Sequence, residues 1–103
     1  MEIFIDSADI NEIEKWHKMG IIDGVTTNPT IMYKDGVYDI REGAKQIAAL
    51  VHPMPMSVEV TTNDLDEMLE QAREFASWAP NIMIKIPQIN QDGVPCYGVI
   101  NEL

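Results

Sequence analysis

The sequence predicts one α/β domain over residues 1–103, in which short parallel strands alternate with helices. Four apolar runs, at residues 3–6, 22–26, 57–60 and 81–86, have the length and composition of buried strands. The segments between them carry apolar residues at the i, i+3, i+4 spacing of a helix that lies on a sheet. Repeated strand–helix units of this kind are typical of a parallel sheet covered by helices.

Composition limits the classes of partner. The chain has 103 residues, of which 46% are hydrophobic and 23% charged, a profile typical of a soluble globular domain. A net charge of −10 argues against binding to nucleic acid or to an anionic membrane, because both need basic patches. The single cysteine excludes an internal disulfide and fits a reducing compartment. We therefore expect a cytoplasmic protein with no nucleic-acid or membrane partner.

The first two strands and the segments that follow them can be assigned in chain order. The strand at residues 3–6 ends in Asp6, and Asp9 can cap a helix that runs to about Met19, just before Gly20. The second strand, at residues 22–26, leads into a turn predicted at residues 27–30, because Asn-Pro is a common turn signal.

The next two units repeat the pattern. A helix is predicted from about residue 38 to residue 52, ended by two prolines, and the third strand covers residues 57–60. Thr62 or Asn63 can cap the following helix, which Pro80 closes. The fourth strand covers residues 81–86. Residues from 88 onward are polar and lead into the start of a weak fourth helix, because Pro95 and Gly98 disfavour it.

Two architectures fit this pattern: an open doubly wound sheet, or part of a (β/α)8 barrel. In both, functional sites lie at the carboxyl ends of the strands. Asp6, Glu59 and Lys85 stand near those ends, and alternation along each strand places them on faces shared with Phe4, Ser57 and Met83. The opposite faces are apolar. A barrel is favoured, because its interior collects such polar residues around one axis.

Lys85 is the most informative of these residues. It lies in the apolar strand Ile82–Ile86, and burial of an ammonium group is costly unless the group is paired or its pKa is depressed. An unprotonated lysine amine attacks carbonyls, which is the chemistry of Schiff-base enzymes. A structural role is the alternative, in which Glu59 pairs with Lys85 and keeps it charged.

Four blocks together resemble the transaldolase and fructose-6-phosphate aldolase family. The blocks are FIDSAD at residues 4–9, GVTTNPT at residues 24–30, SVEV at residues 57–60 and IKIP at residues 84–87. The resemblance runs along the whole chain. It implies class I aldol chemistry in a TIM (β/α)8 barrel, without a cofactor or a metal.

The resemblance also implies a role for each matched residue. Lys85 corresponds to the Schiff-base nucleophile, and Asp6 corresponds to the general acid/base of carbon–carbon cleavage. Asn28 corresponds to the residue that hydrogen-bonds the dihydroxyacetone unit, with Thr26 and Thr27 beside it as further substrate-binding candidates.

Glu59 favours one branch of the family. Transaldolases carry glutamate at this position, where it holds and activates a water, whereas fructose-6-phosphate aldolases usually carry glutamine. We therefore expect transfer of a dihydroxyacetone unit from fructose 6-phosphate or sedoheptulose 7-phosphate to an aldose phosphate, a transferase step of the pentose phosphate pathway. A fructose-6-phosphate aldolase-like lyase is the alternative.

Length sets this chain apart from the family. A barrel of this fold needs about 200 residues or more, so the sequence predicts the N-terminal half, with the chain stopping inside the fourth helix. Such a half holds the nucleophile and the base but lacks the site for the substrate phosphate. Catalysis then requires a homo-oligomer or a complementing half. A non-catalytic interaction module and a phosphoacceptor receiver domain built around Asp6 are the remaining alternatives.

Overall fold

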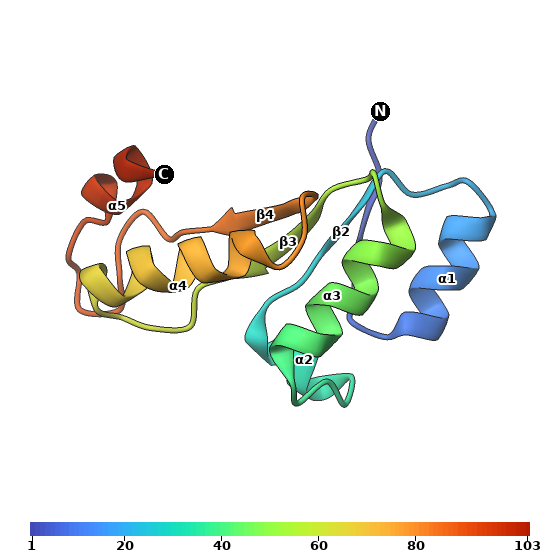
Figure 1. Cartoon of the computed structure of the whole chain (residues 1–103), viewed down its shortest axis with the longest axis horizontal. Coiled ribbons are helices and arrows are strands. Elements are labelled where there is room, and N and C mark those ends of the chain that lie inside the picture. The colour runs from blue at the N-terminus through green and yellow to red at the C-terminus, as the bar shows by residue number, and fades with distance from the viewer.

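The computed structural model describes residues 1–103 and contains one parallel sheet of four strands. The strands are β1 (Phe4–Asp6), β2 (Gly24–Thr26), β3 (Met56–Glu59) and β4 (Ile82–Lys85). They lie side by side in chain order, and every neighbouring pair is parallel (Figure 1). This confirms the predicted fold class: alternating strands and helices with the pattern of the first half of a TIM barrel. The sheet does not close.

Five helices connect and follow the strands: α1 (Ile10–Lys18), α2 (Pro29–Lys34), α3 (Ile40–Val51), α4 (Leu65–Ser77) and α5 (Tyr97–Glu102). An Asp or Asn side chain caps each of the first four, because its oxygen accepts a hydrogen bond from a backbone N–H of the first turn. The cap of α4 is Asp64, not Thr62 or Asn63 as expected. None of the helices is both long and apolar enough to cross a membrane.

The short helix α2 was not predicted, because Asn28-Pro29 has the composition of a turn. The same pair can also begin a helix. Asn28 caps α2 by accepting a hydrogen bond from the Ile31 N–H, and Pro29 occupies the first helical position, where its missing N–H costs nothing.

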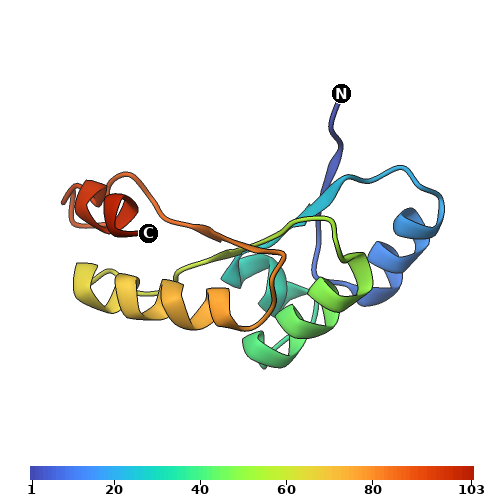
Figure 2. The ribbon, with the colours of Figure 1, turned by 45° about the horizontal axis from the view of Figure 1, so that its top comes forward.

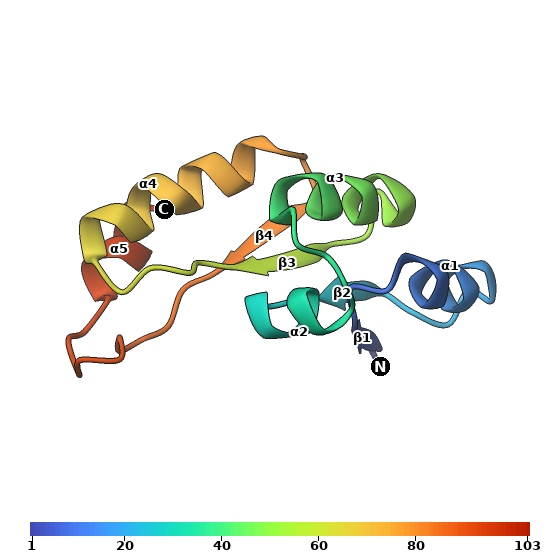
Figure 3. The ribbon, with the colours of Figure 1, turned by 90° about the horizontal axis from the view of Figure 1, so that it is seen from below.

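Helices cover one face of the sheet. Figures 2 and 3 show α3 and α4 on the same side of β3 and β4. A core of twelve buried residues, which includes Val25, Ile47 and Val58, packs against this face. A separate cluster of five buried residues joins α4 to α5. Only 21 of 103 residues are buried, because the core lies on one side of the sheet.

The other face and both sheet edges are open. β1 and β4 each have a strand neighbour on one side only. Phe4 and Met83, whose side chains point to the open face, are 41% and 58% exposed. The radius of gyration is 13.8 Å, against about 13 Å for a compact domain of this size. The sheet therefore has unpaired edges at β1 and β4 and one face that no helix covers.

Candidate active site

The sheet register places four of the predicted site residues on one face. Asp6 lies beside Thr26, and Glu59 lies beside Lys85, as partners in the parallel ladder. Thr26 is in turn the partner of Ser57, which stands two residues before Glu59. Side chains alternate between faces along a strand and match across parallel partners. Asp6, Thr26, Glu59 and Lys85 therefore share one face at the carboxyl ends of the strands.

That shared face is the open one. Val25 and Val58 have the opposite orientation and belong to the core beneath the helices. Lys85 and Asp6 are accordingly exposed, and Glu59 is half-buried. This corrects the expectation of a buried Lys85: the strand sequence is apolar enough for burial, but no second layer covers this side of the sheet.

Lys85 has no ionic partner. The chain contains two ion pairs, Lys18–Glu14 and Arg73–Glu102, and neither includes Lys85. Glu59 is its neighbour in the ladder but forms no salt bridge with it. The alternative in which Glu59 neutralises Lys85 is therefore not present in this structure.

Asn28 lies at the carboxyl end of β2 with part of its side chain free. Its Oδ1 accepts a hydrogen bond of 2.8 Å from the Ile31 N–H at the start of α2. This bond fixes the side chain and leaves the Nδ2 donor without a protein partner. Asn28 lines a pocket of about 380 Å³ together with Glu59 and Gln91.

Thr26 and Thr27 are placed differently. Thr26 is half-buried on the open face, and its hydroxyl donates a 3.4 Å hydrogen bond to the Ile5 carbonyl. Thr27 is fully buried. Its N–H donates to Ser57 Oγ at 3.2 Å, and its hydroxyl donates to the Ser57 carbonyl at 2.6 Å. The Thr27 side chain thus joins β2 to β3 inside the packing and does not reach the open face.

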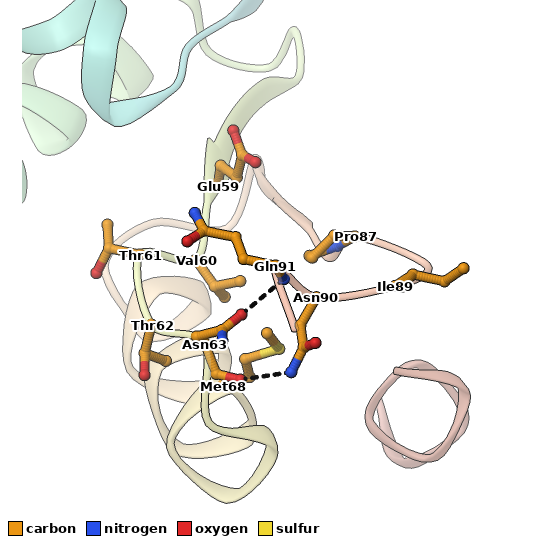
Figure 4. Close-up of a pocket in the computed structure, with 10 residues that line it drawn as sticks. All are labelled: Glu59, Val60, Thr61, Thr62, Asn63, Met68, Pro87, Ile89, Asn90 and Gln91. Atoms are coloured by element: carbon orange, nitrogen blue, oxygen red, sulfur yellow. Dashed lines mark hydrogen bonds between the residues drawn. The ribbon is translucent and has the colours of Figure 1, made fainter. Parts of the chain in front are cut away.

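A second pocket, of about 200 Å³, lies beyond the ends of β3 and β4 (Figure 4). Glu59 forms one part of its wall, and Asn63, Asn90 and Gln91 form another. Neither Lys85 nor Asp6 lines this pocket or the one at Asn28. Glu59 is therefore the residue that belongs both to the open face and to the pockets.

The asparagine and glutamine residues of this pocket were not predicted as site residues. Asn90 followed by Gly93 indicates a turn, and a turn forms there: the Asn90 Oδ1 accepts from the N–H groups of Asp92 and Val94. The contact of this turn with Asn63 depends on the tertiary fold, and no local pattern indicates it.

The carboxyl ends of the strands offer four reactive or hydrogen-bonding groups. They are the amine of Lys85, the carboxylates of Asp6 and Glu59, and the amide of Asn28. No group of three or more His, Cys, Asp or Glu side chains is arranged to hold a metal ion. The titratable group with a clearly displaced pKa lies outside the site: a hydrogen bond and the charge of Lys18 lower the pKa of Glu14 on α1.

Comparison with known proteins connects this arrangement to one family. The sequence profile of the family described as Transaldolase/Fructose-6-phosphate aldolase matches residues 3–101. A protein of Dehalococcoides mccartyi named "Probable transaldolase" is 51% identical over 87 residues, which cover 84% of this chain and 40% of that protein.

Two further relatives carry the same name. One, from Streptococcus agalactiae, is 45% identical over 91 residues, covering 88% of this chain and 41% of the relative. The other, from Roseiflexus castenholzii, is 37% identical over 106 residues, covering 93% of this chain and 48% of the relative. The chain thus spans less than half the length of each of these relatives.

Proposed function

The chain belongs to the transaldolase/fructose-6-phosphate aldolase family, and we propose that it carries the Schiff-base part of a transaldolase active site. The observation that carries this proposal is the ladder register. It sets Lys85 directly beside Glu59, on the same face as Asp6 and Thr26. A nucleophile and two carboxylates at the carboxyl ends of parallel strands are what aldol chemistry requires.

The proposed reaction begins at Lys85. Its unprotonated amine attacks the carbonyl carbon of a ketose, and loss of water leaves a protonated imine. Asp6 then accepts the proton of the hydroxyl next to the breaking carbon–carbon bond, and the electron pair of that bond moves toward the imine. An aldose leaves, and the dihydroxyacetone unit stays on Lys85.

Glu59 and Asn28 support these steps in the proposal. Glu59 holds a water that carries protons to and from the carbons next to the imine, and the free Nδ2 of Asn28 donates to the hydroxyls of the dihydroxyacetone unit. Addition of the bound unit to an aldose phosphate and hydrolysis of the new imine complete the transfer and return Lys85 to the amine.

The donors we propose are fructose 6-phosphate and sedoheptulose 7-phosphate, which would place the reaction in the pentose phosphate pathway of the cytoplasm. Residues 1–103 would form the N-terminal half of the barrel, and a second copy or a complementing half would supply the phosphate site. The relatives support this assignment through their printed name, "Probable transaldolase".

Chemical trapping tests the proposal. The chain is incubated with dihydroxyacetone or fructose 6-phosphate, reduced with borohydride and analysed by mass spectrometry after proteolysis. We expect one reduced adduct, on Lys85, which Lys85→Met abolishes and Lys45→Met preserves, because Lys45 is exposed on α3, away from the open face. Absence of an adduct, under conditions that label a full-length relative, would overturn the proposal.

The second candidate is a non-catalytic fragment or interaction module. It is favoured by one observation: Lys85 and Asp6 face solvent on an uncovered sheet and line neither of the pockets at Glu59. The same trapping experiment separates the two candidates, since a non-catalytic chain labels Lys85 no faster than Lys45.

A further inference from the structure

The segment at residues 88–96, here called the 88–96 hairpin, forms one wall of the pocket at Glu59. Ile89 and Pro95 form an antiparallel bridge, the Cys96 N–H donates to the Gln88 carbonyl at 2.7 Å, and Asn90 and Val94 share a backbone hydrogen bond of 2.9 Å. The hairpin is thus a defined structural unit. It presents Ile89, Asn90 and Gln91 to the pocket.

Asn63, in the connection between β3 and α4, holds this hairpin through three hydrogen bonds. Its Oδ1 accepts from the Gln91 N–H at 2.8 Å, and its Nδ2 donates to Asp92 Oδ2 at 2.6 Å. Its carbonyl accepts from Asn90 Nδ2 at 2.9 Å. The first and the third of these bonds are drawn in Figure 4. One side chain therefore fixes both the backbone of Gln91 and the acidic tip of the hairpin.

Gln91 is the hairpin residue that reaches both pockets. It lines the 200 Å³ pocket beyond β3 and β4 and also the 380 Å³ pocket at Asn28, and Glu59 is common to both. Figure 4 shows its side chain extending across the pocket toward Thr61 and Glu59. An amide offers both donors and an acceptor, which suits the hydroxyls of a sugar chain.

The charge of the pocket excludes the phosphate end of a sugar. No lysine, arginine or histidine lines either pocket, while Glu59 lines both. A phosphate would meet a carboxylate here without a compensating cation, whereas neutral hydroxyls would meet amides and threonine.

We propose that Gln91 is a specificity-determining residue, which binds the hydroxylated carbons of the ketose beyond the three-carbon unit held on Lys85, and that Asn63 is its positioning residue. This inference rests on the proposed function. In this proposal the 88–96 hairpin binds the hydroxylated carbons that fructose 6-phosphate has and dihydroxyacetone lacks.

The test compares two donors in the 103-residue chain. Borohydride trapping on Lys85 is measured against donor concentration, giving a half-saturating concentration and a limiting rate. We expect Gln91→Ala to raise the half-saturating concentration of fructose 6-phosphate by about threefold to tenfold, the loss of about one hydrogen bond. The value for dihydroxyacetone should not change. Gln88→Ala is the matched control, because Gln88 is exposed in the same hairpin and lines neither pocket.

A second set of variants tests the role of Asn63. Asn63→Ala, like Gln91→Ala, should raise the half-saturating concentration of fructose 6-phosphate and leave that of dihydroxyacetone unchanged. Asn63→Asp alone should also weaken binding, because the new carboxylate faces Asp92. The double variant Asn63→Asp/Asp92→Asn exchanges donor and acceptor across the same 2.6 Å contact, so it should restore the affinity for fructose 6-phosphate.

Amide hydrogen exchange tests the positioning independently of activity. The Gln91 N–H should be protected in the parent chain and lose protection in Asn63→Ala, while the Val94 N–H, held by Asn90 within the hairpin, keeps its protection. Exchange of the parent Gln91 N–H at the rate of an unfolded peptide would overturn the role of Asn63.

The outcomes separate this inference from the proposed function. A parent chain that traps neither donor overturns the proposed function and this inference with it. A parent chain that traps both donors, with Gln91→Ala leaving fructose 6-phosphate unaffected or shifting both donors equally, overturns the inference alone.

Discussion

Glu59 is the residue through which the two parts of the candidate site meet. It lies next to Lys85 in the ladder without forming an ion pair, and it also lines both pockets at the ends of the strands. A carboxylate in this position can exchange protons with a water near the imine without holding the lysine in a salt bridge. Its half-buried side chain is open to solvent, so a water can reach the carboxylate, as its proposed role requires.

A single-atom change at Glu59 tests that role. Glu59→Gln preserves the shape of the side chain but removes the proton acceptor, so we expect the rate of adduct formation on Lys85 to fall roughly 100-fold, the lower end of general acid–base effects. The rate is measured by mass spectrometry after borohydride reduction. Glu70→Gln, on the exposed side of α4, is the control. An unchanged rate in Glu59→Gln would contradict the proton-transfer role.

The sequence predicted which residues belong to the candidate site and which of them share a face of the sheet, but not how exposed they are. The motif blocks supplied Lys85, Asp6, Glu59 and Asn28, and strand alternation placed the first three on one face. The exposure of Lys85 could not be predicted in this way, because burial depends on whether a second layer covers the sheet.

Most elements of the fold follow from local patterns. Apolar runs located the four strands, and the i, i+3, i+4 spacing located α1, α3 and α4. The hairpin contacts of Asn63 were missed for a different reason, since they join segments 27 to 29 residues apart in the chain. Hydrogen bonds of that range follow from the arrangement of the strands, which sequence periodicity does not encode.

Close packing between β1 and β2 gives a prediction about stability. A Cβ atom added to Gly24 would lie 2.5 Å from a ring carbon of Phe4 and 2.8 Å from the Pro55 carbonyl oxygen. That oxygen also accepts a 3.0 Å hydrogen bond from the Val25 N–H, so the backbone there cannot move freely. We expect Gly24→Ala to lower the free energy of unfolding by about 1–3 kcal/mol in urea denaturation.

Gly98 provides the control for this prediction. It lies in α5, where a Cβ atom would meet nothing within 4 Å. Gly98→Ala should leave the stability unchanged or raise it by about 0.5–1 kcal/mol, because alanine favours a helix. If both substitutions changed the free energy of unfolding equally, the close approach of Phe4 and Pro55 to Gly24 would not be the cause of the destabilisation.

At the scale of the whole molecule, the uncovered face of the sheet has the strongest physical consequence. It exposes Phe4 on β1 and Met83 on β4, and each of these edge strands has one unpaired side, which pairs readily with other strands. The net charge of −10 opposes association between copies, and salt screens that repulsion.

We therefore predict concentration-dependent self-association that increases with salt, measured by analytical ultracentrifugation. Met83→Glu should weaken it, because the substitution places a charge on the open face beside the β4 edge. Met19→Glu should not, although Met19 is equally exposed, at 57% against 58%, because it lies at the end of α1. A strict monomer at all salt concentrations would contradict association through this face.

The order of the strands has a consequence for how the molecule assembles. Each strand pairs with the one made just before it, so β2 can join β1, and β3 can join β2, without waiting for later residues. Each loop closure therefore spans a single crossover between consecutive strands, which keeps the sequence separation of the paired strands as small as a parallel sheet allows. The free edge of β4, the last strand in the order, is then the place in this sheet where a further parallel strand can pair.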